Sequence, residues 1–230
     1  MKEMISSPIF GVFLTLLAYE IGLYLQKRTG LALANPLLIS IVLIITFLHF
    51  TGVSYGSYEE GGKLISFFIA PATVVLAVPL YKNFQLLKEN AFPILVGIFT
   101  GTVVNVLSLV MIFKVFKLDL ELLFSLIPKS VTTPIGVELS AELGGIPQIT
   151  IAAIIISGVT GVIFGPIIFK LFKIDDPVAK GVAFGTAAHA LGTARALEEG
   201  EIEGGMSGLS IGLAGVITVL LAPLLLNLLL

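Results

Sequence analysis

The sequence predicts an all-α polytopic membrane protein with about seven or eight transmembrane segments, some of them discontinuous. Of its 230 residues, 57% are hydrophobic and 12% are charged, whereas a soluble domain carries about 25% charged residues. The mean hydropathy is +1.08. Several stretches also run without a charge for the roughly 20 residues that a helix needs to cross the bilayer. We expect one integral membrane domain over residues 1–230.

The composition also excludes several classes of protein. The chain has no cysteine, which removes disulfide scaffolds, thiolate zinc sites and thiol nucleophiles. Thirteen basic and fifteen acidic residues give a net charge of -2, so the basic surface of a nucleic-acid binder is missing. His49 and His189 are far apart, and no metal-ligand spacing occurs. We therefore expect no metal and no cofactor.

Charge-free windows locate the candidate spans in chain order. They are Met4–Tyr19, Thr29–Tyr58, Leu64–Tyr81, Asn90–Phe113, Leu143–Phe169 and Gly204–Leu230. The first window becomes a full span if Glu20 lies inside the protein. No small-residue cleavage site follows residues 5–25, so we interpret them as a retained span rather than a signal peptide. Residues 1–62 are expected to hold the N-terminal spans.

Two further apolar stretches are interrupted. Leu122–Glu142 contains two prolines, a glycine and a lysine, and Val178–Leu197 contains a run of small residues and three basic ones. Broken backbone at membrane depth is tolerated only where protein or a water-filled cavity satisfies it. Paired broken segments point to the binding site of a transporter. Leu64–Tyr81, with two prolines, is a milder case and makes Thr73 a candidate for the same site.

An internal repeat supports this interpretation. Ile112–Asp119 is almost identical to Ile168–Asp175, which begins 56 residues later, and the same offset pairs Gly136 with Gly192. Each unit has a broken apolar segment, an acidic glycine-rich turn and a long smooth helix. The candidate units are residues 63–118, 119–174 and 175–230, the first of them the weakest. The copies are parallel or inverted according to how often each one crosses the membrane.

The first interrupted stretch carries candidate anion ligands. Ser130, Thr132 and Thr133 supply hydroxyls, and Lys129 supplies a charge. A half-helix that starts near Pro134 would present free N–H groups and the positive end of its dipole to an anion. The alternative is a kinked span whose hydroxyls bond to their own helix and whose lysine extends to the headgroups.

The second interrupted stretch contains His189, Gly192, Thr193 and Arg195. On an unbroken helix His189 and Arg195 point in opposite directions, whereas a break near Gly192 brings them together. The planar fork of an arginine matches a carboxylate. The alternatives are an interfacial ion pair between Arg195 and the glutamates that follow it, and a histidine that is merely packed or hydrogen-bonded.

Two more polar residues lie inside apolar runs. Glu138 is a candidate to carry a coupling proton or cation, or to pair structurally with Lys129 or Arg195. Asn105 lies in the middle of a smooth window, where helix packing or polar support is the expected role.

The motifs favour a non-enzyme. No glycine-rich loop ending in Gly-Lys-Ser or Gly-Lys-Thr occurs, so ATP-driven transport by this chain is not expected. A serine–lysine hydrolase built on Lys129 and Ser130 is disfavoured, because adjacent residues on a helix do not face each other.

Four strings carry a resemblance to a known family. They are Ser54–Gly62, Pro71–Tyr81, Pro128–Ile135 and Gly185–Ala194. With these strings, and from the second span to the C-terminus, the chain resembles the LrgB/CidB family of antiholin-like, YohK-like membrane proteins. The string Lys129–Pro134 is the most specific of them.

The resemblance implies two functions. The one we favour is secondary transport of a small organic monocarboxylate of the pyruvate, glycolate, glycerate or lactate class by alternating access. The alternative is a holin- or antiholin-like role that regulates murein hydrolase activity and cell lysis, with a small membrane partner of the LrgA/CidA type. The resemblance also implies kinship of fold with the sodium/proton antiporter and bile-acid symporter group. We expect a multi-pass homo-oligomer, a dimer, in the inner (plasma) membrane.

Overall fold

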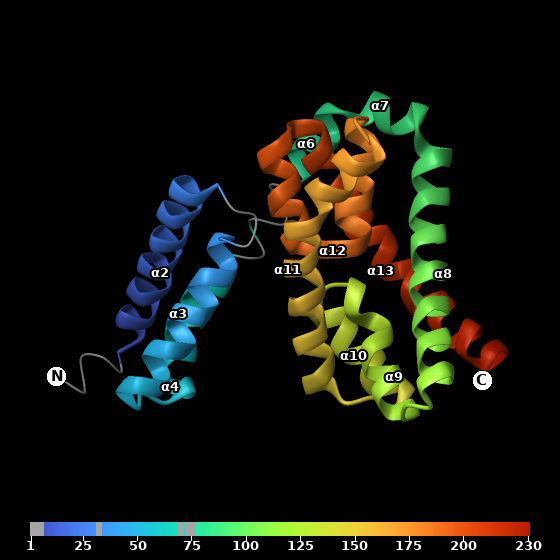
Figure 1. The fold of residues 1–230 in the computed structure, drawn as a ribbon. Coiled ribbons are helices and arrows are strands. Elements are labelled where there is room, and N and C mark those ends of the chain that lie inside the picture. Colours follow the sequence, from blue (N-terminus) through green and yellow to red (C-terminus); the bar gives the residue numbers. More distant parts are fainter. Residues whose placement is uncertain (1–6, 31–33, 69–70, 72–76) are drawn as a thin grey trace. The chain divides into compact units, whose positions relative to one another are not determined.

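The computed structural model describes residues 7–30, 34–68, 71 and 77–230. It divides into two compact units, Met1–Val75 and Leu76–Leu230. The elements of the described residues are all helices, with no strand among them, so the all-α prediction is confirmed (Figure 1). Thr73 lies outside the described residues. The expectation of a single domain stays a prediction.

Unit 1 contains three helices. They are α2 (Pro8–Thr29), α3 (Pro36–Thr51) and α4 (Tyr55–Ser66). The side chain of the residue before each helix accepts a hydrogen bond from a backbone N–H of the first turn. Helices α2 and α3 end at a glycine in the left-handed conformation, which glycine adopts without steric cost. A Cβ added to Gly61 would lie 2.9 Å from the Cα of Gly11, so these glycines let α4 approach α2 closely. Thr15 Oγ1 and Tyr58 Oη, 2.8 Å apart, add a hydrogen bond across the same contact.

Unit 2 contains the interrupted segments and three long helices. Its elements are α6 (Ala77–Lys82), α7 (Phe84–Glu89), α8 (Ala91–Phe116), α9 (Leu120–Leu126), η1 (Ile127–Ser130), α10 (Thr133–Leu143), α11 (Pro147–Phe172), α12 (Pro177–Glu199) and α13 (Glu201–Leu229). The 26 residues of α8 and of α11 give each a length of about 39 Å, enough to cross a bilayer.

Within the described residues, four helices are long and apolar enough to span a membrane: α2, α8, α11 and α13. The apolar helix α3 is shorter, with 16 residues. Large apolar side chains are exposed along the long helices, for example Phe92 on α8 and Leu171 on α11, which is the arrangement expected of a surface that faces lipid. The chain is therefore a multi-pass membrane protein, and the total of seven or eight spans stays a prediction.

The first interruption separates η1 from α10. Val131 (φ -110°, ψ 177°) and Thr132 (φ -69°, ψ 151°) are extended. Helix α10 then starts at Thr133 with Pro134 in its first turn, where a missing N–H costs no hydrogen bond. The half-helix predicted to start near Pro134 is therefore present.

The second interruption lies inside α12, at His189 (φ 44°, ψ -132°). The sequence predicted the break near Gly192, three residues later. Gly192 has a different function: a Cβ there would clash with the carbonyl oxygen of Phe184 and lie 2.8 Å from the Cβ of Ala188. The hinge is at the histidine, and the glycine lets the two halves of α12 pack side by side.

The two interrupted segments are built alike. A Cβ on Gly136 would lie 3.3 Å from the carbonyl oxygen of Pro128, eight residues earlier. Gly192 faces the carbonyl oxygen of Phe184, again eight residues earlier. Pro128 and Phe184 are 56 residues apart, and so are Gly136 and Gly192, so the two contacts follow the offset of the repeat. Each segment is therefore a helical hairpin in which a glycine permits the second arm to touch the first.

The long helices also follow the repeat. The bounds of α11 lie 56 residues beyond those of α8 at both ends. Both helices end at a lysine in the left-handed conformation, Lys117 (φ 52°) and Lys173 (φ 54°). In Figure 1, α8 and α11 run in opposite directions. These matches support repeated units in inverted orientation, which stay a prediction.

Two apolar clusters hold the hairpins against α8. One gathers Val106 and Val110 of α8 with Leu123 and Ile127 of the first hairpin. The other gathers Ile94 and Ile98 of α8 with the start of α12 and part of α13. The segment of α8 between the clusters, residues 99–105, belongs to neither core.

Candidate functional site

A cavity of about 390 Å³, with several polar side chains in its wall, adjoins this middle segment of α8. Helices α8, η1, α11, α12 and α13 all contribute to its wall. The lining residues are Gly101, Thr102, Val104, Asn105, Ser108, Lys129, Ser130, Ser157, Thr160, Gly161, Thr186, Ala187 and Thr218. The wall thus combines hydroxyl side chains from several helices with one lysine and one amide.

The cavity lies at the middle of the long helices. Asn105 is close to the centre of α8 at residues 103–104, and Thr160 is at the centre of α11. Thr218 is three residues from the centre of α13 at residue 215. These helices are long enough to cross the bilayer, and the cavity lies at about the middle of their length.

Lys129 is held at the cavity by Asn105. The Nζ of Lys129 donates a hydrogen bond to Asn105 Oδ1. The Nδ2 of Asn105 donates to the carbonyl oxygen of Ile127 at 3.0 Å. One amide therefore satisfies a backbone carbonyl near the first break and positions the lysine. The sequence predicted helix packing or polar support for Asn105, and this role stays a prediction.

Lys129 has no acidic partner among the described residues. The ion pairs found there join Lys63 to Glu60, Lys82 to Glu201, and Arg195 to two glutamates. Glu138, the candidate coupling group, is exposed on α10 and lines none of the three cavities described. A charged side chain at membrane depth is costly unless it is paired. The cavity therefore has an uncompensated positive charge at its wall.

Ser130 does face Lys129, contrary to the sequence-based argument. That argument holds for a regular helix, whereas these residues lie at the end of a 3₁₀ turn that is followed by extended Val131. The Lys129 Nζ–Ser130 Oγ distance is 3.4 Å, longer than the roughly 2.7–3.2 Å of a well-formed hydrogen bond. The contact is too long to indicate an activated serine.

His189 and Thr193 are buried and bonded to protein groups. His189 Nε2 lies 2.9 Å from the carbonyl oxygen of Ile154. Gly158 makes room for the ring, since a Cβ there would lie 2.8 Å from His189 Cε1. Thr193 Oγ1 donates to the carbonyl oxygen of His189 at 3.2 Å and lies 2.7 Å from Ser207 Oγ. These contacts hold the backbone of His189 in its positive-φ conformation, which costs about 1–3 kcal/mol in isolation.

The threonines and proline that follow the first break lie apart from the cavity wall. Thr132 is the N-cap residue of α10, without a side-chain capping bond. Thr133 and Pro134 are exposed. None of the three lines a described cavity. Their assignment as substrate ligands stays a prediction.

Arg195 lies at a partly exposed position near the end of α12. Its guanidinium is 2.8 Å from Glu198 and 3.4 Å from Glu199, and its side chain is 30% exposed. This is the geometry of the interfacial ion pair that the sequence left open as an alternative. Of the predicted substrate-binding residues, Lys129 and Ser130 meet at the cavity, and Gly192, Thr193 and Arg195 do not line it.

Sequence reasoning missed the hydroxyls on the smooth helices. Ser157 and Thr160 of α11 and Thr218 of α13 all line the cavity. Ser157 and Thr160 are three residues apart, so they share a helix face. The available signal was a pair of hydroxyls at helical spacing in the centre of a charge-free window.

Two Gly-x-Ser-x-Gly strings also occur, at residues 52–56 and 208–212. Ser54 caps α4, where its Oγ accepts a hydrogen bond from Ser57 N at 3.2 Å. Ser210 is buried inside α13 and donates to the carbonyl oxygen of Met206. Neither serine stands on the strand-to-helix turn that makes this string a nucleophile elbow. The described residues also contain no group of three or more metal-ligating side chains.

These features define a class: a multi-pass, all-helical membrane protein in which two interrupted hairpins meet at a cavity lined by a lysine and several hydroxyls. The model of the LrgB-like family matches residues 15–228, and the chain belongs to that family. It is 40% identical over 222 residues to the antiholin-like protein LrgB of Bacillus subtilis (strain 168), covering 96% of each chain. The proteins of the same name from Bacillus cereus (strain B4264) and Bacillus anthracis (strain CDC 684 / NRRL 3495) are each 39% identical over 219 residues, or 95% of each chain. No solved structure matches the chain significantly.

Proposed function

We propose that this protein is a secondary carrier of a small organic monocarboxylate in the inner membrane. The observation that carries the proposal is Lys129, which has no acidic partner among the described residues and lines a cavity at about the middle of the long helices. A bound carboxylate would supply the missing negative charge, and a charge-assisted hydrogen bond from an ammonium group is about twice as strong as a neutral one.

The rest of the wall suits a small anion. Hydroxyls of Ser130, Ser157 and Thr160 line the same cavity as Lys129 and can each donate one hydrogen bond. A volume of about 390 Å³ is near the lower end of the roughly 300–1,000 Å³ found for ligand pockets. The site therefore favours a compact solute with a few oxygens over a lipid or a peptide.

Alternating access would use the hairpins. The imidazole of His189 joins the hinge of α12 to α11 through the carbonyl oxygen of Ile154. Thr186 and Ala187 line the cavity just before that hinge, and Lys129 and Ser130 line it just before the other break. A shift of either hairpin would change which side of the cavity is open, as in carriers with discontinuous helices.

The relatives favour a second candidate. They are named antiholin-like proteins, and this name supports an antiholin-like role in lysis control more directly than it supports a carrier. In that role the chain would act with a small membrane partner of the LrgA/CidA type and regulate murein hydrolases. The cavity would then be a gate or a regulatory site rather than a transport site.

Uptake into proteoliposomes separates the two candidates. The purified chain is reconstituted, and uptake of labelled pyruvate, glycolate and lactate is followed with and without ion gradients. A carrier gives saturable uptake in which the three acids compete. No saturable uptake, or leakage shared by unrelated solutes such as an entrapped dye, would reject the carrier and leave the antiholin-like role as the better candidate.

A further inference from the structure

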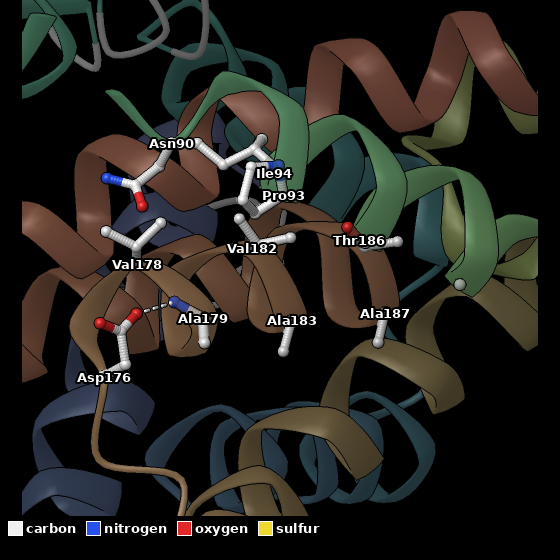
Figure 2. A pocket seen from close by; sticks show the side chains of 12 residues that line it. Asn90, Pro93, Ile94, Asp176, Val178, Ala179, Val182, Ala183, Thr186 and Ala187 are labelled. Atoms are coloured by element: carbon white, nitrogen blue, oxygen red, sulfur yellow. Dashed lines mark hydrogen bonds between the residues drawn. The ribbon is translucent and has the colours of Figure 1, made fainter. Parts of the chain in front are cut away.

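A second cavity, of about 470 Å³, forms a groove between α8 and the first half of α12. Asn90 and Asp176 lie at one end of it, and Thr186 and Ala187 lie at the other (Figure 2). The side chains between the two ends, such as Val182, are mostly apolar.

The groove leads from a helix end to the middle of the unit. Asn90 and Asp176 are the N-cap residues of α8 and α12. A Cβ on Gly97 would lie 3.5 Å from Val182 Cγ1, and one on Gly101 would lie 3.1 Å from Thr186 Cγ2. The two helices therefore start together and run in parallel. From Pro177 to Thr186 the chain advances about 14 Å at roughly 1.5 Å per residue, close to half of the 30 Å hydrocarbon layer, to order of magnitude.

At its inner end the groove joins the cavity of Lys129. Gly101, Thr186 and Ala187 line both spaces. The hydroxyl oxygen of Thr186 is buried and has no hydrogen-bond partner, although a buried polar atom normally has one. The methyl group of this side chain occupies the notch at Gly101. Thr186 therefore lines both spaces and has a buried, unpaired hydroxyl.

We propose that this groove is the route by which the anion reaches the cavity, and that the Thr186 hydroxyl, buried in this structure, turns toward the anion and donates a hydrogen bond to it at the entrance. The inference rests on the proposed carrier function and adds an entry path and a binding residue to it. Asp176, the acidic side chain of the groove, is bound by the N–H of Ala179 at 2.8 Å, and the positive end of the α12 dipole offsets its charge.

Thr186→Val tests the binding role, with Thr186→Ser as the matched control. The change to valine keeps the shape and removes a hydroxyl that bonds no protein group, so thermal stability is expected to hold. The KM for labelled pyruvate uptake is expected to rise about 3- to 10-fold, the equivalent of one hydrogen bond. The serine variant is expected to stay within twofold of the wild type. A fall in melting temperature with unchanged KM would show a structural role and overturn the assignment.

Cysteine labelling tests the route independently of transport. Because the chain has no cysteine, Ala183→Cys gives a single thiol in the groove wall. Val216→Cys is the control, because it lies near the centre of α13 and is exposed, yet lines none of the described cavities. An anionic methanethiosulfonate reagent is expected to modify the first variant in proteoliposomes, and to spare the second.

The outcomes separate the inference from the function on which it rests. Modification of Ala183→Cys, slowed by pyruvate, supports the route. An unreactive thiol would mean that lipid fills the groove and would overturn it. If the wild type takes up pyruvate while Thr186→Val and the labelled Ala183→Cys transport normally, the inference fails alone. If the wild type shows no saturable uptake, the proposed function fails as well.

Discussion

Replacement of Lys129 by glutamine is the perturbation that the structure defines best. The change removes the charge at the cavity wall and keeps a side chain that can donate a hydrogen bond. An ammonium group about 4 Å from a carboxylate, at an effective dielectric constant of about 20, contributes about 4 kcal/mol. The glutamine recovers about 1 kcal/mol of this as a neutral hydrogen bond. The net loss of about 3 kcal/mol corresponds to roughly 100-fold weaker binding.

The assay is labelled pyruvate uptake into proteoliposomes, together with thermal unfolding in detergent. The same substitution at Lys170, which is exposed in the last turn of α11, controls for the loss of a positive charge elsewhere. Removal of a half-buried charge that has no ionic partner is expected to leave the melting temperature unchanged or raised. A Lys129→Gln variant that folds and transports with a KM within threefold of the wild type would refute the reasoning. An equal rise of the KM in the Lys170→Gln variant would also refute it.

Three further predictions follow from the same contacts. Asn105→Leu leaves Lys129 and a backbone carbonyl without their partner. The free energy of unfolding should therefore fall by about 1–3 kcal/mol. Thermal unfolding of a double variant with Lys129→Met should show part of this loss recovered. Gly158→Ala places a methyl group within 2.9 Å of the His189 ring. This substitution should lower the free energy of unfolding by about 1–3 kcal/mol and slow transport. An unchanged melting temperature would contradict the close packing of Gly158 against His189. Arg195→Gln should leave the KM for pyruvate within twofold, because Arg195 pairs with Glu198 and Glu199. A KM raised more than tenfold would instead support the prediction that Arg195 binds the substrate.

The sequence predicted the class of fold because the relevant signals are local. A stretch without charges long enough to cross the bilayer must be helical there, since lipid cannot satisfy a broken backbone. Prolines, glycines and an embedded lysine marked the interrupted segments for the same reason. The period of 56 residues also recurs in the structure, in the bounds of α8 and α11.

The site was harder to predict because it depends on which helix faces meet. Lys129 and Ser130 reach the cavity because they immediately precede a break. Thr132 and Thr133, only a few residues later, do not line it, because the chain becomes extended at Val131 and Thr132 and changes direction there. The spacing of residues along a segment cannot show such a change of direction.

The hinge of α12 shows the same difficulty. Glycine is the residue expected at a break, and Gly192 was the natural candidate. The structure instead places the positive φ at His189, where a hydrogen bond to α11 holds the strained backbone. Gly192 is needed for close packing. A glycine pattern alone does not distinguish these two uses, because both exploit the missing side chain.

Counterflow in proteoliposomes tests the central claim most directly. Vesicles containing the wild-type chain are loaded with unlabelled pyruvate and diluted into a trace of labelled pyruvate. A carrier that exposes the Lys129 site alternately to each side exchanges inner for outer substrate, so we predict a transient accumulation of label above its equilibrium level. We predict no such accumulation with Lys129→Gln at the same pyruvate concentration. Label that enters wild-type vesicles only to equilibrium, at a rate that preloading does not change, would contradict the carrier and the role of Lys129.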